Sequence, residues 1–374
     1  MHYVGGNRLT LLKNGEQYFP ALAGAIDAAM REIFLETYIF ADDQTGSLVA
    51  AALARAAERG VAVYLLLDGF GARDFAPRLR EMLLRAGVEI KVYRPKISPW
   101  TLRRNRLRRM HRKIACIDGA VGFVGGINVI DDYDTPHQTP PRYDFAVRVE
   151  GTLVGKVRDA AAVFWKSSPL RKPVDGAPRV EDQKAALVVR DNMRHRRDIE
   201  QAYLELVGSA REEVIIANAY FFPGRRFRKA LAQAAARGVR ITLLLQGRVE
   251  YALLHYASRA LYRSFLASGI EIQEYQKGFL HAKVAVFDGR QACVGSSNID
   301  PFSLLLAREA NLFVDDAAFG ATLRARLMEA IQRGAQAVPT QHWQRQTFWA
   351  RVNIWLSLHF VRLLIAFAGY ERYH

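Results

Sequence analysis

Cysteine is scarce in this sequence: only Cys116 and Cys293 occur among 374 residues, and both stand in apolar runs. Two isolated cysteines make no disulfide framework, so we expect both thiols to be buried and reduced, as in a reducing compartment. The first residues also lack a basic stretch followed by an apolar core, so the sequence predicts no signal peptide and no N-terminal membrane anchor. The pattern excludes a small disulfide-rich secreted protein.

Acidic residues are too few to balance the basic ones. Asp and Glu number 37 against 53 Lys and Arg, which gives a formal net charge of +16. Such a charge attracts polyanions, either nucleic acid or the anionic face of a membrane, and does not by itself choose between them. Half of the residues are hydrophobic and 24% are charged, as in a folded globular chain, and the length suits about two domains.

The chain repeats itself at an offset near 180 residues. The segment AERGVAVYLLLDG (57–69) is matched by AARGVRITLLLQG (235–247), and LETYIF (35–40) is matched by ANAYFF (217–222). An additional arginine-rich stretch near 95–110 in the first half shortens the later offset to 170. The sequence therefore predicts two copies of one structural unit.

Both copies predict alternating strands and helices. The β-branched runs 61–67 and 241–245 are typical of buried strands, and the stretches 47–58 and 228–237 of helices that end at a glycine. Strands that alternate with helices indicate an α/β fold. We predict two lobes, each a mixed β-sheet flanked by helices, packed about a pseudo-two-fold axis.

The predicted boundaries follow from composition. The lobes cover residues 1–170 and 184–340, and a linker rich in proline, glycine and charge covers 168–185. A hydrophobic, basic tail occupies 341–374.

One motif occurs at equivalent points of both copies. The segments HRKIACIDGAVGFVGGIN (111–128) and HAKVAVFDGRQACVGSSN (281–298) both follow the pattern H-x-K-x4-D-x6-G-[GS]-x-N. Side chains alternate along a strand, so each histidine shares a face with the lysine two residues later. Four residue types recur at the same spacing in both copies. This repetition predicts that the two copies together form one composite site between the lobes.

Such a site suits displacement at a phosphodiester. One of the imidazoles of His111 and His281 attacks phosphorus, and the other protonates the leaving alkoxide. Lys113 and Lys283 stabilise the charge on the phosphate oxygens. The amides of two further motif residues, Asn128 and Asn298, bind the same phosphate. A diester carries one negative charge, so we expect no metal and no cofactor.

The aspartates of the motif, Asp118 and Asp288, are candidates for the catalytic set. Each stands in an Asp-Gly turn after the apolar residues of the strand, and this position favours a structural role.

The duplicated pattern resembles the HKD motif of the phospholipase D superfamily, over nearly the whole chain. The resemblance implies that a carboxylate downstream of each motif orients the histidine, and the matching residues are Asp144 and Glu309. It further implies that His111 is the nucleophile and His281 the acid and base. Ser296, which replaces a glycine of the first copy, is expected to bind phosphate.

Within this superfamily the chain is most similar to the B-type bacterial cardiolipin synthases, through segments such as LLKNGEQYFPAL (11–22) and VGSSNIDPFSLLLAREANL (294–312). The resemblance implies transfer of a phosphatidyl group to phosphatidylglycerol through a phosphohistidine. The donor is phosphatidylglycerol or phosphatidylethanolamine. It also implies peripheral association with anionic phospholipids, at the cytoplasmic face of a bacterial inner membrane.

Two segments fit a lipid substrate independently. The insert ISPWTLRRNRLRRM (97–110) interleaves arginines with large apolar residues, as in headgroup contacts, although a solvated loop has the same composition. The tail at 347–370 fits a helix in the membrane interface or a helix packed on the lobes. The arginines expected to contact headgroups are Arg103, Arg104, Arg106, Arg108 and Arg109.

Other functions remain open at this stage. Water in place of the lipid hydroxyl would give a phospholipase D-type hydrolase, and another alcohol a different phosphatidyltransferase. A metal-independent nuclease of the same superfamily would use the same chemistry, but the tail and the extended match favour lipid over nucleic acid. A binding protein with relic motifs is disfavoured because both copies are complete.

Overall fold

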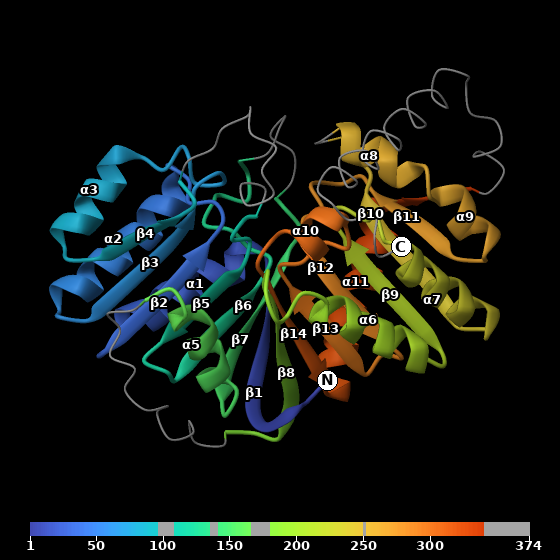
Figure 1. Cartoon of the computed structure of the whole chain (residues 1–374), viewed down its shortest axis with the longest axis horizontal. Coiled ribbons are helices and arrows are strands. Elements are labelled where there is room, and N and C mark those ends of the chain that lie inside the picture. Colours follow the sequence, from blue (N-terminus) through green and yellow to red (C-terminus); the bar gives the residue numbers. More distant parts are fainter. Residues whose placement is uncertain (96–107, 135–140, 166–179, 250–251, 340–374) are drawn as a thin grey trace.

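The computed structural model describes residues 1–95, 108–134, 141–165, 180–249 and 252–339 (Figure 1). Strands and helices alternate in the first part of each half, and strands that follow one another directly carry the motifs. The first half contains β1 (Val4–Lys13), α1 (Asn14–Asp27), β2 (Glu32–Thr37), α2 (Gln44–Glu58), β3 (Ala62–Asp68), α3 (Pro77–Arg85), β4 (Glu89–Tyr93), β5 (Lys113–Ile117), β6 (Val121–Gly125), β7 (Phe145–Gly151) and α5 (Val154–Ala162). The second half contains β8 (Gln183–Arg190), α6 (Asp198–Ser209), β9 (Glu213–Asn218), α7 (Arg225–Ala236), β10 (Arg240–Gln246), α8 (Ala252–Arg259), α9 (Tyr262–Ala267), β11 (Glu271–Tyr275), β12 (Lys283–Phe287), β13 (Gln291–Gly295), α10 (Pro301–Leu305), β14 (Glu309–Asp315), α11 (Ala317–Gly334) and β15 (Ala335–Ala337).

The described strands form one continuous mixed sheet with an internal symmetry. From the centre outward the order is β1, β7, β6, β5, β2, β3, β4 in the first half and β8, β14, β13, β12, β9, β10, β11 in the second, with β15 added at the outer edge. The central seam is antiparallel and joins β1 to β8. This order confirms the predicted α/β fold of two equivalent lobes about a pseudo-two-fold axis.

The seam also changes one predicted boundary. β8 begins at Gln183, and Val4 pairs with Ala185 across the seam. The last residues of the predicted linker (168–185) therefore lie in a strand of the central sheet.

The predicted local elements are present. The helices expected at 47–58 and 228–237 are α2 and α7, and the strands expected at 61–67 and 241–245 are β3 and β10. Gly60 and Gly238 follow their helices with φ of +88° and +90°, a conformation that glycine adopts without a Cβ clash. The two cysteines are free and buried in β5 and β13, as expected.

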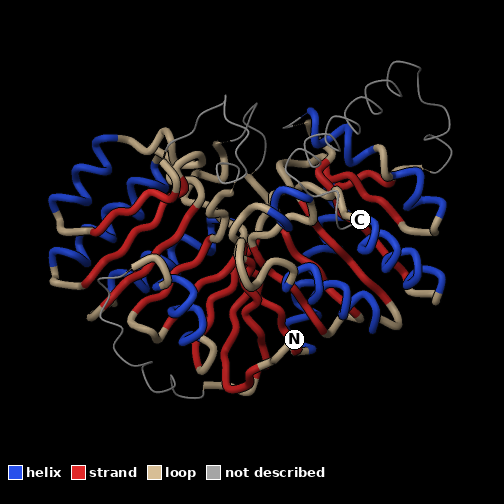
Figure 2. The backbone as a smooth tube through the Cα atoms, in the orientation of Figure 1, coloured by secondary structure: helices blue, strands red, loops and turns tan. Residues whose placement is uncertain are grey.

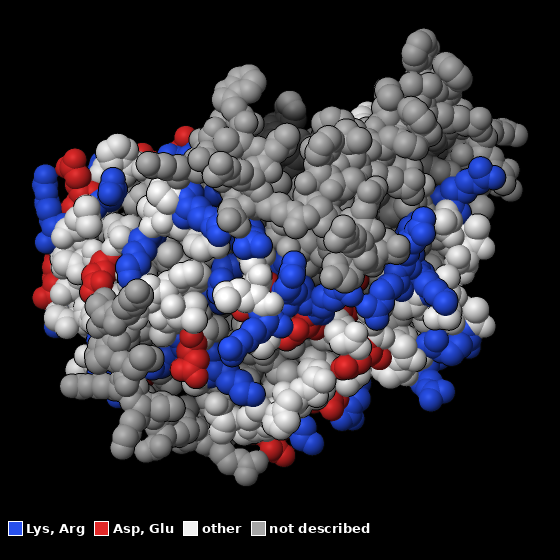
Figure 3. Space-filling model, in the orientation of Figure 1, with Lys and Arg blue, Asp and Glu red and all other residues white. Residues whose placement is uncertain are grey.

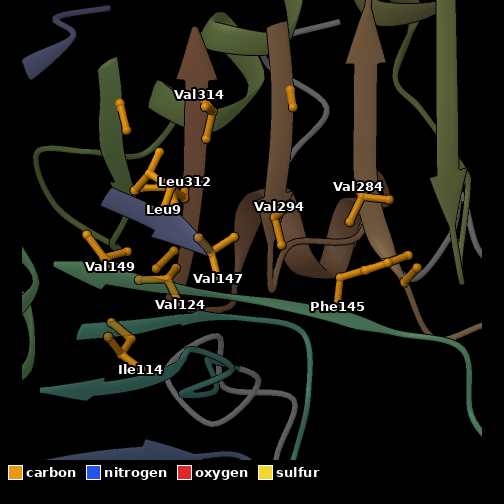
Figure 4. Close-up of a cluster of buried hydrophobic side chains, with 14 of the residues drawn as sticks. Leu9, Ile114, Val124, Phe145, Val147, Val149, Val284, Val294, Leu312 and Val314 are labelled. Atoms are coloured by element: carbon orange, nitrogen blue, oxygen red, sulfur yellow. The ribbon is translucent and has the colours of Figure 1, made fainter. Parts of the chain in front are cut away.

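Three apolar clusters hold the molecule together, and one of them belongs to both halves. α1, α2 and α3 cover one cluster of the first half, and α6, α7 and α9 cover one of the second. The shared cluster packs strands β5–β7 against β12–β14 together with α5 and α11. Figure 2 shows the strands of both halves side by side with helices around them, and Figure 4 draws part of the cluster. Its labelled members in Figure 4 are Leu9, Ile114, Val124, Phe145, Val147, Val149, Val284, Val294, Leu312 and Val314. Burial of this surface fixes β5 and β12, and the motif residues before them, relative to each other.

Several predicted features lie outside the described residues. These are the tail at 341–374, most of the linker, and Arg103, Arg104 and Arg106 of the basic insert. Within the described ranges, no helix is both long enough and apolar enough to span a bilayer.

Candidate active site

The two motif histidines are joined to the opposite half through the backbone. The amide of His111 donates to the carbonyl of Arg308 at 2.9 Å, and the amide of His281 donates to the carbonyl of Tyr143 at 3.0 Å. Each acceptor directly precedes a predicted orienting carboxylate, Glu309 or Asp144. The interface between the halves therefore brings both motifs to one place, as the duplicated spacing predicts.

The two histidine–carboxylate pairs are crossed between the halves. Nδ1 of His111 lies 2.9 Å from Oε1 of Glu309, and Nδ1 of His281 lies 2.6 Å from Oδ2 of Asp144. An ionised carboxylate only accepts hydrogen bonds, so with Glu309 and Asp144 ionised, Nδ1 of each ring carries the hydrogen and Nε2 is left with a lone pair. The sequence identified the carboxylates but not the fact that each serves the histidine of the other half.

The lysines of the motif are buried beside the imidazoles. Lys113 and Lys283 are 3% and 0% exposed, and their Nζ atoms donate to the carbonyls of His111 and His281, the former at 2.8 Å. Burial lowers the pKa of Lys113 to about 7 and raises the pKa of Asp144 to about 7. An anionic substrate would favour the charged form of Lys113, because it adds negative charge beside this side chain.

The pKa values of both histidines reflect one shared site. Burial lowers the pKa of His111, and Lys113 and Lys283 lower it further against the opposing effect of Glu309. The pKa of His281 is lowered further than that of His111, by burial first and then by the same two lysines, Arg142 and His111. Both rings are therefore neutral near pH 7 in the free protein. Among the described residues, no group of three His, Cys, Asp or Glu side chains could hold a metal ion.

Ser296 supports a carboxylate in this structure. Its Oγ donates to Oε2 of Glu309 at 2.5 Å and accepts from the amide of Ala310 at 3.0 Å. The hydroxyl hydrogen is used by Glu309, which gives Ser296 a positioning role, and its contact with phosphate stays a prediction. The motif asparagines, Asn128 and Asn298, are each 5% exposed and stay candidates for the phosphate contact.

The equivalent position of the first half, Gly126, is occupied by the other carboxylate. A Cβ atom at Gly126 would lie 2.7 Å from Oδ2 of Asp144, closer than a normal contact. We expect Gly126→Ala to displace Asp144 and to lower turnover about 10²-fold, the usual cost of a small misplacement of catalytic groups. Turnover of the purified variant measures this effect. Gly155→Ala in α5 is the control, because no atom lies within 4 Å of the added Cβ; equal activities of the two variants would contradict the expectation.

The motif aspartates lie at the opposite end of the strands from the histidines. Asp118 accepts hydrogen bonds from the amides of residues 30–32, and Asp288 accepts from those of 211–213. Six residues of largely extended chain lie between His111 and Asp118, a span of roughly 20 Å. Both carboxylates therefore hold loops, which supports the structural role that their Asp-Gly turns favour.

The variant Asp288→Asn separates the structural role from a catalytic one. Asn tolerates the positive φ of 50° at this position but loses the charge and one acceptor oxygen. We expect the free energy of unfolding to fall by about 1–3 kcal/mol, the usual cost of unmade hydrogen bonds, with unchanged activity of the folded protein. Urea unfolding and turnover measure the two quantities. A stable but inactive variant would return Asp288 to the catalytic set.

Tyr38 is a site residue that the sequence did not reveal. Its ring centroid lies 4.8 Å from that of His111, and Nζ of Lys113 lies 5.2 Å from the ring. The match of LETYIF with ANAYFF places Tyr38 against Tyr220. In the structure, however, Phe40 pairs with Val129 and Phe221 with Ile299, each the residue after a motif asparagine, so Phe40 is equivalent to Phe221 and the alignment shifts by one residue. Ala219 is the true counterpart, so the tyrosine makes the site asymmetric.

Part of the basic insert faces inward. Arg109 lies 3.7 Å from buried Asp68, its guanidinium lies 5.7 Å from the Phe70 ring, and its side chain is 16% exposed. Arg109 is therefore engaged within the protein, and its contact with a headgroup stays a prediction. Arg108, the first residue of the described range 108–134, is half-buried.

Comparison with known proteins gives matches over the whole chain. The family described as cardiolipin synthase, PLD-like domain, matches residues 22–133 and 203–331. Cardiolipin synthase B of Escherichia coli is 40% identical over 99% of this chain and 91% of its own length. The probable cardiolipin synthase YwiE of Bacillus subtilis is 32% identical over 91% of this chain and 69% of its own length.

The fold is also similar to a solved structure of low sequence identity. The crystal structure of phosphatidylserine synthase from Haemophilus influenzae has a TM-score of 0.71 at 13% identity, and covers 95% of this chain and 93% of its own.

Proposed function

Because this chain belongs to the cardiolipin synthase family of phospholipase D-like proteins, we propose that it joins a phosphatidyl group to phosphatidylglycerol and so forms cardiolipin. The chain is a phosphatidyltransferase. The observation that carries the mechanism is the crossed arrangement of His111 on Glu309 and His281 on Asp144. Two rings with free Nε2 atoms, beside two buried lysines, match the needs of a two-step transfer at phosphorus.

In the first step, one Nε2 attacks phosphorus and the bond from phosphorus to the leaving oxygen breaks. By the family resemblance we assign this attack to His111. Its Nδ1–H donates to Glu309, and the negative carboxylate stabilises the positive charge that the ring acquires. His281 protonates the leaving alkoxide, which departs as an alcohol. Because His281 is neutral in the free protein, it must take up this proton when the anionic substrate binds.

In the second step, the acceptor replaces the enzyme on phosphorus. Neutral His281 removes the proton from a hydroxyl of phosphatidylglycerol, the alkoxide attacks phosphorus, and the phosphorus–nitrogen bond to His111 breaks. Lys113 and Lys283 stabilise negative charge on the non-bridging oxygens in both steps. Asn128 and Asn298 supply amide groups to the same oxygens.

We further propose that the protein binds the surface of an anionic membrane. The net charge of +16 supports this, and Figure 3 shows lysine and arginine side chains in a band across the middle of one face. Juxtaposed basic side chains contribute about 1 kcal/mol each at an anionic surface. We place the protein at the cytoplasmic face of a bacterial inner membrane, with phosphatidylglycerol and phosphatidylethanolamine as candidate donors.

Product analysis tests the function directly. Purified protein receives labelled phosphatidylglycerol in mixed micelles containing EDTA, with and without phosphatidylethanolamine. We expect cardiolipin together with released glycerol or ethanolamine, and the released alcohol identifies the donor. Phosphatidic acid as the main product would indicate hydrolysis instead. Cleavage of single-stranded DNA without lipid turnover would indicate a nuclease.

A further inference from the structure

A cavity of about 140 Å³ lies beside the active site but contains none of its residues. Tyr143 and Tyr275 contribute aromatic rings to its wall, and the C-terminal half of α11 contributes Arg326, Glu329 and Arg333. Lys13 from the end of β1 and Lys277 from the loop after β11 complete the charged lining. This volume accommodates several water molecules or one phosphate group.

The lining is strongly basic. Glu329 is its carboxylate, and it lies 2.8 Å from Arg333 and 3.6 Å from Arg326. Lys13 and Lys277 form no ion pair with any described carboxylate, and Nζ of Lys13 lies 5.5 Å from the Tyr143 ring. Four cations around one carboxylate leave uncompensated positive charge, which favours an anion.

Tyr143 connects this cavity to the catalytic groups. Its ring packs on Phe145 and Tyr275, at centroid distances of 5.2 and 5.5 Å, and its hydroxyl donates to the carbonyl of Arg326 at 2.7 Å. Its own carbonyl accepts from the amide of His281. The next residue is Asp144, which holds the His281 ring. One short segment therefore contributes to the cavity and to the catalytic pair.

The pseudo-symmetric position in the first half is filled. Arg158 pairs with Glu32 as Arg324 pairs with Glu213, which aligns α5 with α11. Phe164 stands six residues after Arg158, whereas Ala330 stands six residues after Arg324.

The Phe164 ring occupies the space that stays open in the second half. Its centroid lies 5.6 Å from that of Tyr93, and the guanidinium of Arg308 lies 4.8 Å from it. Within the described residues, one aromatic ring therefore fills in the first half the position that Ala330 leaves open in the second.

We propose that the cavity lined by Lys13, Lys277, Arg326 and Arg333 is a second anion-binding site, which takes the phosphate of an anionic phospholipid headgroup. An anion there neutralises the two lysines beside the segment that carries Tyr143 and Asp144. The site is separate from the phosphate that reacts at the histidines. Its occupation is measurable without turnover, so the proposal is independent of the reaction assigned above.

The test counts bound headgroups. The water-soluble headgroup analogue glycerophosphoglycerol and, separately, inorganic phosphate are titrated by calorimetry into wild-type protein and into Ala330→Phe, which fills the cavity as Phe164 does in the first half. We expect two equivalents of the analogue to bind the wild type and one to bind the variant. Ala325→Phe, on the exposed face of α11, is the matched control and should keep both equivalents.

A charge variant protects the test against misfolding of Ala330→Phe. Lys277→Gln should weaken binding at one equivalent about 3- to 10-fold and leave the other unchanged, while Lys277→Arg keeps both, as expected for a surface charge contact. Lys229→Gln on α7 is the control, because this exposed lysine does not line the cavity. Equal numbers of bound equivalents in the wild type and in Ala330→Phe would overturn the proposal. If two equivalents of inorganic phosphate bind the wild type but only one equivalent of glycerophosphoglycerol does, the assignment to a lipid headgroup is overturned.

Discussion

His281→Asn should leave a protein that still forms a covalent phosphatidyl adduct but releases it to the acceptor about 10²–10⁴-fold more slowly, the usual contribution of general acid and base groups. The variant retains Nε2 of His111 and its contact with Glu309, so the nucleophile is intact. It lacks the base that activates the incoming hydroxyl. Donors with a good leaving group, such as a nitrophenyl ester, make the first step independent of the missing acid.

The reciprocal variant separates the two roles. His111→Asn should form no adduct with either donor, because the attacking nitrogen is absent. Denatured protein is separated from micelles after incubation with labelled donor, and the acid-labile label bound to protein is counted. His195→Asn, a half-exposed histidine paired with Asp198, is the control and should behave as the wild type.

The opposite pattern has an electrostatic argument in its favour. Burial and the two lysines lower the pKa of His281 further than that of His111, so His281 is the ring that more readily stays an unprotonated nucleophile. If His111→Asn forms the adduct and His281→Asn does not, the roles are exchanged, although the pair and its chemistry stay the same. An adduct in both variants would overturn the phosphohistidine mechanism.

The sequence predicted those features that depend on local patterns. β-branched runs such as that in β10 cannot be exposed without cost, and glycines such as Gly238 end helices by adopting a positive φ, so strands and helices lay where expected. The duplicated H-x-K pattern identified both histidines and both lysines, because strand alternation sets each pair on one face. The internal symmetry of the sheet followed from the repeat.

The features that the sequence missed depend on contacts between the halves or on the alignment of the repeat. The partner of each carboxylate is set by packing across the shared core, which no spacing within one half records. The contact of Ser296 with Glu309 has the same origin, since a serine in the motif is equally compatible with a substrate contact. The sequence did not reveal Tyr38 because its plausible match with Tyr220 is wrong by one residue. In extended chain, a shift of one residue moves a side chain to the opposite face of the sheet.

The crossed pairing makes a prediction that the order of residues along the chain would not suggest. Glu309 lies in the second half, yet Glu309→Gln should share the defect of a His111 variant. The glutamine keeps the shape, but its amide can donate to Nδ1 and so favours the tautomer whose hydrogen is on Nε2. A ring protonated on Nε2 cannot attack phosphorus, so we expect turnover to fall about 10²–10⁴-fold, as for other losses of an orienting carboxylate.

The adduct assay distinguishes crossed from uncrossed pairing. Glu309→Gln should lose adduct formation together with His111→Asn, whereas Asp144→Asn should retain it and slow release together with His281→Asn. The comparison depends on which variants behave alike, so it holds whichever histidine attacks. Glu58→Gln, at the exposed end of α2, is the control for the amide substitution. If Glu309→Gln behaved like His281→Asn, the carboxylates would act within their own halves. The interface between the lobes would then hold the site together without supplying each imidazole with its partner.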